Sequence, residues 1–296
     1  MPRLSPDELA HRRTGLGSTC IVEANGLAPW QGAGAMRLYC EKLGIMSSDD
    51  ADEDGDDRAA WLEWGHVQEP IIADWYERTR GVKLQLGGQV RDTIHPWIWA
   101  TLDRTVIGAN KLVEVKNCGS PQLYSHWDVS SQDGVPRYVR AQVTAAMYVH
   151  GARECDVVAS IGGRPPHVWT VAYDAELAEL LIAGAVRFWS MVQAGTAPPL
   201  DHTEASRAYL LHRYPCNADR RMVDATPEAD AVASERIEAS RMAADGERTK
   251  KACDARLLAL VGDADGIVGD GWKMTWKNGA GGVRRSRFSG KGGEAE

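Results

Sequence analysis

The sequence predicts a mixed α/β core with a mainly helical C-terminal extension, and three observations support this class. Segments with the two-residue alternation of β-strands lie between segments with the apolar spacing of helices. Hydrophobic residues make up 44% and charged residues 25% of the 296 residues, as in ordinary globular proteins. A Gly-Thr-Ala-Pro-Pro stretch at 195–199 indicates a linker. We therefore expect a core over residues 1–198 and an extension over residues 199–296.

The N-terminal quarter predicts three short helical regions. Residues 7–13 form the first and carry Arg12 and Arg13. Ser18 and Thr19 precede the next helix, where hydroxyl side chains are typical N-caps. The backbone N–H groups at such a helix start either are only capped or also hold a phosphate. Residues 30–43 predict the third helix, which ends before an acidic loop at 47–58.

A longer helical pattern runs over residues 58–80 and contains Pro70. Proline is tolerated in the first turn of a helix but not well inside one, so we expect the helix to bend or restart there. Glu69 then lies at a helix start. An acid in that position either complements the helix dipole or belongs to a functional site.

Two strands at 97–103 and 111–117 carry the most informative side chains, after shorter strand-like pieces at 82–86 and 89–92. The second strand places Glu114 and Lys116 on one face, because side chains alternate along a strand. The intervening residues 104–110 turn the chain back and bring Asp103 towards Glu114. Paired carboxylates suit Mg²⁺ or Mn²⁺, and a nearby lysine orients or activates a water. The pattern predicts metal-dependent phosphodiester hydrolysis, although Glu-x-Lys alone also occurs as a surface salt bridge.

The remaining elements follow from the same periodicities. Residues 137–150 predict a helix with Gln142 on an otherwise small and apolar face, where a buried glutamine needs a hydrogen-bond partner. Strands at 155–161 and 167–173 flank a glycine-rich turn, and residues 175–193 form an amphipathic helix. The extension predicts a long helix at about 227–260, a small strand at about 271–277 and a disordered tail at 290–296.

Charge and cysteine usage restrict the class of protein. The net charge of −7 comes from seven carboxylates between Asp49 and Asp57, and the rest of the chain is neutral. A neutral body can still present a basic groove to a polyanion. The six cysteines are far apart and form no zinc-ribbon or iron–sulfur spacing, which favours reduced thiols. We expect a cytoplasmic protein, because the sequence has neither a membrane-spanning stretch nor the apolar core of a signal peptide.

The order of these motifs resembles the YqaJ-like viral recombinase family, the lambda-exonuclease type of PD-(D/E)xK nuclease. The resemblance covers about residues 8–195. It consists of Arg-x-Gly followed by hydroxyls, a helical Trp-Gly-x-x-x-Glu-Pro, a strand Asp, a strand Glu-x-Lys and a helical Gln. Leu102 stands where the family name has proline, which supplies no ligand. The resemblance implies a restriction-endonuclease-like core, with a central mixed sheet flanked by helices.

The resemblance also implies roles for single residues. Asp103 and Glu114 match the metal-binding acids, with the carbonyl of Val115 as a further ligand. Lys116 matches the lysine that positions the attacking water, and Glu69 matches the helical acid of the metal site. Gln142 matches the active-site glutamine. Arg13, Ser18 and Thr19 lie where the family engages the terminal 5′-phosphate.

The implied function is a 5′-to-3′ exonuclease that uses Mg²⁺, with two ions and with Mn²⁺ as a substitute. Its substrate would be linear double-stranded DNA, and its products would be 5′-phosphates and a 3′ single-stranded overhang for recombination. The implied partners are DNA ends, a single-strand annealing protein and further copies of the chain, as in the trimeric rings of the family. The implied setting is the cytoplasm of a bacterial host, with the gene on a phage or prophage.

Two alternatives stay open at this point. One is another PD-(D/E)xK nuclease, either an endonuclease or a Cas4-like enzyme without the iron–sulfur cluster. The other is a DNA-binding protein that retains the nuclease fold but no activity. The scattered cysteines argue against the Cas4-like enzyme, and the full set of matched acids and lysine argues against loss of activity.

Overall fold

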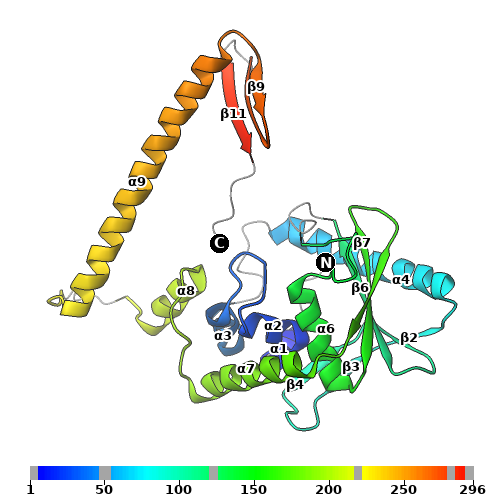
Figure 1. Cartoon of the computed structure of the whole chain (residues 1–296). Helices are drawn as coiled ribbons and strands as arrows, with labels where there is room; N and C mark the ends of the chain where they lie inside the picture. The colour runs from blue at the N-terminus through cyan, green and yellow to red at the C-terminus, as the bar shows by residue number, and fades with distance from the viewer. Residues whose placement is uncertain (1–5, 47–54, 120–125, 217–221, 279–283, 291–296) are drawn as a thin grey trace. The chain divides into compact units, whose positions relative to one another are not determined.

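The structure of the chain is a computed structural model that describes residues 6–46, 55–119, 126–216, 222–278 and 284–290. It divides into two units, Met1–Cys216 and Asn217–Glu296 (Figure 1). Helix α8 (Glu204–Arg213), which no sequence pattern predicts, belongs to the first unit and buries Ala205 in its core. The division therefore lies beyond the predicted boundary at residue 198. Most of the predicted acidic loop and the predicted disordered tail lie outside the described residues.

The larger sheet of the first unit is mixed, and its strand order is β2-β5-β6-β7-β8. β6 pairs parallel with β7 on one side and antiparallel with β5 on the other. Helix α6 connects the two parallel strands, as a parallel pair requires. The elements are β2 (Leu84–Leu86), β5 (Arg104–Val106), β6 (Lys111–Cys118), α6 (Arg137–His150), β7 (Glu154–Ile161) and β8 (His167–Ala172). A mixed sheet flanked by helices confirms the predicted fold class.

The two faces of this sheet carry different helices. Leu112 of β6 packs in the cluster that contains α6, whereas Val113 packs in the cluster that contains α4 (Gly55–Arg80). Ile72 and Tyr76 anchor α4 on the sheet, and the Tyr76 hydroxyl donates a 2.6 Å hydrogen bond to the buried carboxylate of Asp156. The α6 face is therefore the face of Glu114 and Lys116.

A smaller sheet has the strand order β1-β4-β3, with β1 and β4 parallel. Its strands are β1 (Leu16–Gly17), β3 (Gln89–Arg91) and β4 (Ile98–Thr101). The surrounding helices are α1 (Pro6–Arg12), α2 (Ser18–Ala24), α3 (Ala35–Leu43) and α7 (Ala175–Ala194). Leu16 and Ile98 are fully buried among side chains of these helices. α3 starts later than predicted, because Gly32 has a positive φ of 73° and Gly34 follows it.

α4 continues through Pro70, so of the two predicted outcomes, a bend or a restart, the restart is wrong. A proline within a helix removes one backbone donor and crowds the carbonyl four residues earlier. Pro70 is exposed, and Ile72 and Tyr76 hold the second half of the helix on the sheet. Packing therefore outweighs one lost hydrogen bond. Glu69 consequently lies inside a long helix, three residues before Ile72 and on the same face.

Residues 104–110 are not simply a turn, which corrects the predicted pairing of the strand at 97–103 with β6. Arg104–Val106 form β5, which pairs with β6 through Arg104 opposite Val113 and Thr105 opposite Leu112. The turn itself is shorter and uses Gly108 at φ 82°. The strand at 97–103 belongs to the smaller sheet, so Asp103 lies where the chain passes from one sheet to the other.

The second unit consists of a long helix and a three-stranded antiparallel sheet with the order β11-β10-β9. Its elements are α9 (Pro227–Val261), β9 (Gly266–Gly269), β10 (Trp272–Asn278) and β11 (Arg284–Gly290). Thr226 caps α9 by accepting a 3.2 Å hydrogen bond from the Ala229 N–H. The predicted long helix and strand are confirmed, whereas β9 and β11 were without a sequence signal. In the described part of the chain, no helix is both long and apolar enough to cross a bilayer.

Candidate active site

One cavity of about 900 Å³ in the first unit gathers residues from both sheets and from α1, α2, α4 and α6. Every residue predicted for the site except Arg13 lines it. These residues are Ser18, Thr19, Glu69, Asp103, Glu114, Val115, Lys116 and Gln142. Side chains that are spread over more than 120 residues of sequence therefore meet in one place.

Asp103 reaches the edge of β6 where the pairing with β5 has ended. The backbone N–H of Val115 donates a 2.8 Å hydrogen bond to Oδ2 of Asp103. A strand residue directs its N–H and C=O towards the same edge. The carbonyl oxygen of Val115 therefore points to the side on which Asp103 lies, as a ligand role would require.

Glu114, Lys116 and Gln142 form a closed set of contacts on the α6 face of the sheet. The Lys116 ammonium lies 2.7 Å from Oε1 of Glu114 and donates a 3.0 Å hydrogen bond to Oε1 of Gln142. The Gln142 amide in turn donates a 2.8 Å hydrogen bond to Oε1 of Glu114. The glutamine thus has both of the partners that its place on an apolar helix face requires, and it fixes the lysine and the acid relative to each other.

The pKa values of Asp103 and Lys116 are both raised, for different reasons. Burial, together with the carboxylates of Glu114 and Glu69, raises the pKa of Asp103 from 3.8 to about 7. Burial alone would lower the pKa of Lys116, but Glu114 and Asp103 outweigh it and the pKa lies above its ordinary value. Lys116 is therefore protonated at neutral pH, so it can donate hydrogen bonds and positive charge but cannot accept a proton.

Glu69 lines the same cavity, but its carboxylate is held by Arg104. Oε1 of Glu69 lies 2.5 Å from Nη1 of Arg104, which also donates a 2.7 Å hydrogen bond to the carbonyl of Asp103. Among the described residues, no three His, Cys, Asp or Glu side chains converge as a ligand set for a metal. Only Oε1 of Glu69 pairs with Arg104, so direct ligation of a cation would use Oε2.

Asp103 and Glu114 fit a divalent cation by the chemistry of their donor atoms. Mg²⁺ and Mn²⁺ prefer carboxylate and carbonyl oxygens, which Asp103, Glu114 and Val115 provide. The raised pKa of Asp103 reflects burial and an unfavourable neighbouring negative charge. A cation between the two carboxylates would offset that repulsion.

The wall formed by α1 and α2, with Lys42 of α3 beside it, contains cationic side chains that the sequence pattern does not single out. Arg12 and Lys42 line the cavity, whereas Arg13 does not. The Arg13 guanidinium instead lies over Gly44, with Cζ 2.9 Å from where a Cβ on that glycine would stand. Successive residues of a helix point about 100° apart. Arg12 and Arg13 consequently face different surroundings.

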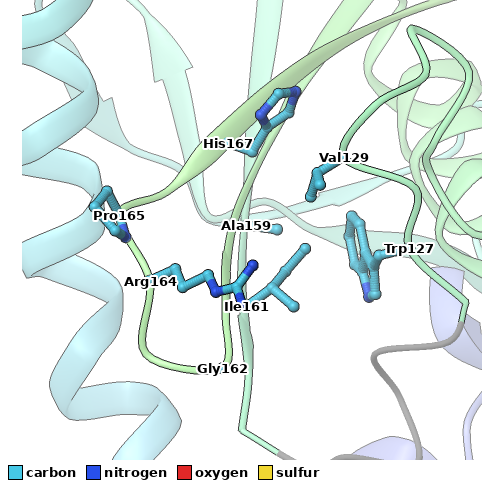
Figure 2. A pocket seen from close by; sticks show the side chains of 8 residues that line it. All are labelled: Trp127, Val129, Ala159, Ile161, Gly162, Arg164, Pro165 and His167. Atoms are coloured by element: carbon cyan, nitrogen blue, oxygen red, sulfur yellow. The ribbon is translucent and has the colours of Figure 1, made fainter.

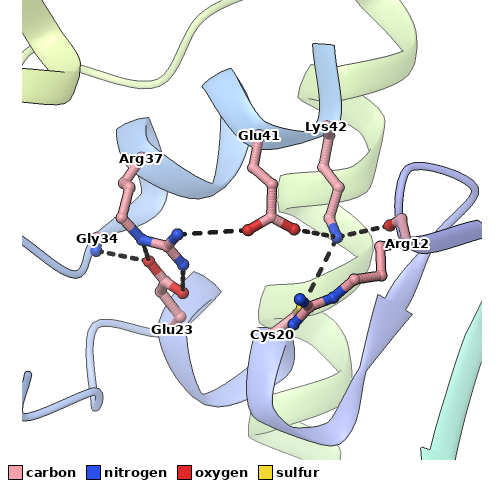
Figure 3. A network of polar contacts seen from close by, with 7 residues as sticks. All are labelled: Arg12, Cys20, Glu23, Gly34, Arg37, Glu41 and Lys42. Atoms are coloured by element: carbon pink, nitrogen blue, oxygen red, sulfur yellow. Dashed lines mark hydrogen bonds and ion pairs between the residues drawn. The ribbon is translucent and has the colours of Figure 1, made fainter. Parts of the chain in front are cut away.

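Lys42 is held by a buried polar network that links α2 to α3 (Figure 3). Its ammonium donates a 2.7 Å hydrogen bond to the Arg12 carbonyl and lies 3.3 Å from Glu41. Glu41 lies 3.3 Å from Arg37, whose guanidinium also pairs with the buried Glu23. The network fixes the end of α1 and so the position of Arg12 at the cavity. The helical spacing could have predicted that Lys42 is buried, because it lies four residues after the apolar Leu38 and so on the same helix face.

A second cavity, of about 520 Å³, lies at the turn between β7 and β8 (Figure 2). It shares no lining residue with the first. Trp127, Val129, Ala159, Ile161, Gly162, Arg164, Pro165 and His167 line it. A pocket without carboxylates offers no ligands of the kind that Mg²⁺ prefers, so the first cavity is the candidate active site.

Comparisons with known proteins agree with this geometry. Residues 9–153 match the model of the YqaJ-like viral recombinase domain family. No curated protein sequence matches the chain.

Solved exonuclease structures are similar to the chain at low sequence identity. The alkaline exonuclease LHK-Exo from Laribacter hongkongensis is 17% identical over 65% of this chain and 94% of that chain, with a TM-score of 0.49. Its complex with dAMP is 18% identical over 71% of this chain and 97% of that chain, with a TM-score of 0.50. A phage-related exonuclease from Haemophilus somnus 129PT is 9% identical over 62% of this chain and 96% of that chain, with a TM-score of 0.47.

The family match spans the whole segment that contains the predicted site residues, from Arg13 to Gln142. The similarity to the LHK-Exo complex extends the agreement to the fold. Residues 9–153 of the chain therefore match the YqaJ-like viral recombinase domain, and the fold of the chain is similar to that of the exonuclease LHK-Exo.

Proposed function

We propose that this chain is a Mg²⁺-dependent exonuclease that degrades one strand of linear duplex DNA from its 5′ end. The product would be a 3′ single-stranded overhang for recombination by strand annealing. The observation that carries the proposal is the single cavity in which two carboxylates, a protonated lysine and a bridging glutamine meet hydroxyl and cationic side chains. A YqaJ-like recombinase domain accounts for that combination.

Each residue of the site has a separate role in the proposed hydrolysis. Asp103, Glu114 and the Val115 carbonyl would hold divalent cations, for which Mn²⁺ can substitute. Such cations polarise a phosphate and lower the pKa of a bound water. Lys116 donates hydrogen bonds to the attacking water or to the developing negative charge on phosphorus oxygens. Gln142 keeps Lys116 and Glu114 in register, and in-line attack leaves a 5′-phosphate on the product.

The α1–α2 wall would receive the 5′ end. Ser18 and Thr19 line the cavity with hydroxyl donors, and Arg12 and Lys42 add positive charge. Charge-assisted hydrogen bonds from such groups are the usual means of binding a phosphate. Because Arg13 lies outside the cavity lining, we assign the arginine role to Arg12 in place of Arg13.

The family resemblance supports further parts of the proposal. A second cation would involve Glu69, directly through Oε2 or through a water. The partners would be DNA ends, a single-strand annealing protein and further copies of the chain in a ring. The setting would be the cytoplasm of a bacterial host.

The activity is tested with Mg²⁺ and duplex DNA carrying a 5′-phosphate and a label on either end. We expect wild-type protein to release nucleotides from the 5′ end, to leave covalently closed circles intact and to lose activity in EDTA. Lys116→Ala should be slower by at least about a thousandfold, because it removes a positioned charge from the transition state. Equal activity of wild type and Lys116→Ala would overturn the proposal, and cutting of closed circles would show an endonuclease.

The end-binding role is tested in the same assay with 5′-phosphate and 5′-hydroxyl duplexes. Arg12→Ala should reduce the preference for the 5′-phosphate by about tenfold, as loss of one charge-assisted hydrogen bond does. Arg13→Ala is the matched control and should keep the preference. An unchanged preference in Arg12→Ala would remove Arg12 from the phosphate site.

A further inference from the structure

One face of the three-stranded sheet in the second unit is apolar, and the helix of the unit covers part of it, since Phe288 on this face is 51% exposed. Met274 of β10 is 1% exposed, and the register places it between Phe288 of β11 and Ile267 of β9. Trp272 stacks on Phe288 with ring centroids 6.0 Å apart. The C-terminal part of α9 contacts β9 and β10 and buries Val261. This face is the small core of the unit.

The opposite face of the same sheet is basic. Because side chains alternate along a strand, the residues between the apolar ones share the other face. Those of β10 and β11 are Lys273, Thr275, Lys277, Arg285, Arg287 and Ser289, which we call the basic sheet face. All but the half-buried Thr275 are exposed.

The positive charges on the basic sheet face are not neutralised within the unit. Lys277 lies directly opposite Arg285, with Arg287 two residues further along β11. Like charges in directly opposed positions of an antiparallel pair destabilise the sheet. None of the four cations forms an ion pair within the described residues, and the face itself carries no carboxylate. The arrangement lowers the stability of the sheet unless an anion covers it.

Arg284, their neighbour in β11, shows what a structural arginine in this sheet looks like. Its guanidinium lies 4.2 Å above the Trp276 ring and donates 3.1 Å hydrogen bonds to the carbonyls of Trp276 and Gly262. It also donates to the carbonyl of Ala264. Arg284 thus connects β11 to the loop after α9, whereas the side chains of Arg285 and Arg287 form no such contact with the described part of the chain.

We propose that the basic sheet face binds the sugar–phosphate backbone of DNA without reading its sequence. Lysine and arginine beside the hydroxyls of Thr275 and Ser289 are the donors that proteins direct at phosphate oxygens. The face has no aromatic ring on which a base could stack and no Asn or Gln to read a base edge. Its only apolar side chain among the described residues is Val268 of β9, opposite Lys273, which is too little to anchor an amphipathic surface in a membrane. The proposal rests on the proposed function only in taking DNA as the polyanion.

The test measures binding of full-length protein to a fluorescent duplex in EDTA, where hydrolysis cannot proceed. The variant K277Q/R285Q/R287Q removes three charges from the basic sheet face. Its matched control, R248Q/K250Q/K251Q, removes three charges from α9, where Arg248 pairs with Asp245 and both lysines lie within 4 Å of Glu247. The two variants have the same net charge, and each replaces three lysine or arginine residues by glutamine.

We expect the sheet variant to bind at least about tenfold more weakly at low salt, and the control to stay within about twofold of wild type. The slope of log K against log salt should fall by about two to three for the sheet variant only, since each lost phosphate contact contributes about 0.9. Thermal unfolding checks the fold, and the sheet variant should unfold no earlier than wild type because it loses the Lys277–Arg285 repulsion.

Equal losses in the two variants, or no loss in either, would overturn the proposal. Unchanged DNA binding combined with lost binding of a poly-glutamate peptide would also overturn it and would identify an acidic protein as the partner. The result is separable from the proposed function. A chain without hydrolytic activity can still bind DNA through this face, and an active nuclease can bind without it.

Discussion

Gln142 contacts both Glu114 and Lys116, which also contact each other directly at 2.7 Å. Its amide N–H donates a 2.8 Å hydrogen bond to Glu114, and its amide oxygen accepts a 3.0 Å hydrogen bond from Lys116. Gln142 therefore holds these two side chains of β6 in one arrangement. Lys116 keeps its charge through Glu114 whether or not the glutamine is present. The contribution of Gln142 is therefore positional.

We expect Gln142→Leu to lower the turnover number by about ten- to a hundredfold while the Kd for DNA stays within about twofold. The two lost hydrogen bonds each contribute about 1 kcal/mol, and about 1.4 kcal/mol corresponds to a factor of ten in rate. Single-turnover kinetics with saturating enzyme measures this effect.

Gln89→Leu is the matched control for this prediction. Gln89 lines the same cavity, but it is exposed and its amide contacts only the ring of His11, at 3.0 Å. Its substitution should leave the single-turnover rate nearly unchanged. Equal rates for the two leucine variants would show that Gln142 has no positional role.

At the scale of elements, the packing of α7 on α2 depends on a glycine. A Cβ on Gly184 would stand 1.9 Å from Oδ1 of Asn25. The Asn25 amide cannot move away freely, because it donates hydrogen bonds of 2.9 Å and 3.0 Å to the carbonyls of Ile21 and Leu181. The two helices therefore approach each other at a distance that only glycine allows.

We expect Gly184→Ala to lower the free energy of unfolding by about 1–2 kcal/mol, because overpacking outweighs the better helix propensity of alanine. Gly246→Ala should do the opposite and stabilise α9 by up to about 1 kcal/mol. Gly246 lies inside that helix, and a Cβ there would meet nothing within 4 Å. Denaturant unfolding measures the first effect and amide hydrogen exchange of α9 the second. Stabilisation by Gly184→Ala would contradict the close contact.

At the scale of the whole molecule, charge is distributed very unevenly. The chain is acidic overall, with a net charge of −7, and five carboxylates and three cationic side chains line the candidate active site. Divalent cations on those carboxylates would therefore be needed to make the site attractive to a polyanion. The buried network of Glu41 and Lys42 also makes the stability of the fold depend on pH.

Burial alone would raise the pKa of Glu41, but Lys42, Arg12 and Arg37 outweigh it and hold the pKa below the ordinary 4.5. A carboxylate whose pKa is lower in the folded than in the unfolded protein stabilises the fold at pH values above its unfolded pKa. That contribution is lost as the pH falls through the folded value. We expect Glu41→Gln to cost roughly 3 kcal/mol at pH 7, because it leaves Lys42 buried without its counter-ion.

The difference between wild type and Glu41→Gln should be constant above about pH 5 and should shrink below pH 4.5. Denaturant unfolding between pH 3 and pH 7 measures it. Glu179→Gln, at an exposed position of α7, is the control with the same change in charge and should differ little from wild type. A difference that stays constant down to pH 3 would show that folding does not shift the pKa of Glu41.

Local patterns in the sequence predict most of the elements of the first unit and part of the site. The alternation in β6 places Glu114 and Lys116 on one face, and the helical spacing of α6 exposes Gln142 as a residue in need of partners. The contacts of 2.7 Å, 2.8 Å and 3.0 Å among these three residues bear out that reading. Their roles in hydrolysis stay predictions.

Features that depend on distant pairing could not be derived in this way. β5 is only three residues long, so the route that brings Asp103 to Val115 has no signal of its own. Pro70 predicts a bend or a restart of α4, and the packing of Ile72 and Tyr76 overrides the restart. The residues of β9 and β11 have no strand pattern of their own and form strands by pairing with β10. The register between β10 and β11 then shows which side chains share the basic sheet face.

The sequence by itself determines which chemical groups the protein has and which neighbours share a strand or helix face, because side-chain periodicity is local. The tertiary structure decides which of those groups meet. It selects Arg12 and not Arg13 at the cavity, engages Glu69 with Arg104, and buries Lys42 beside Glu41. These outcomes depend on contacts between elements far apart in the chain, and no window of sequence contains both partners.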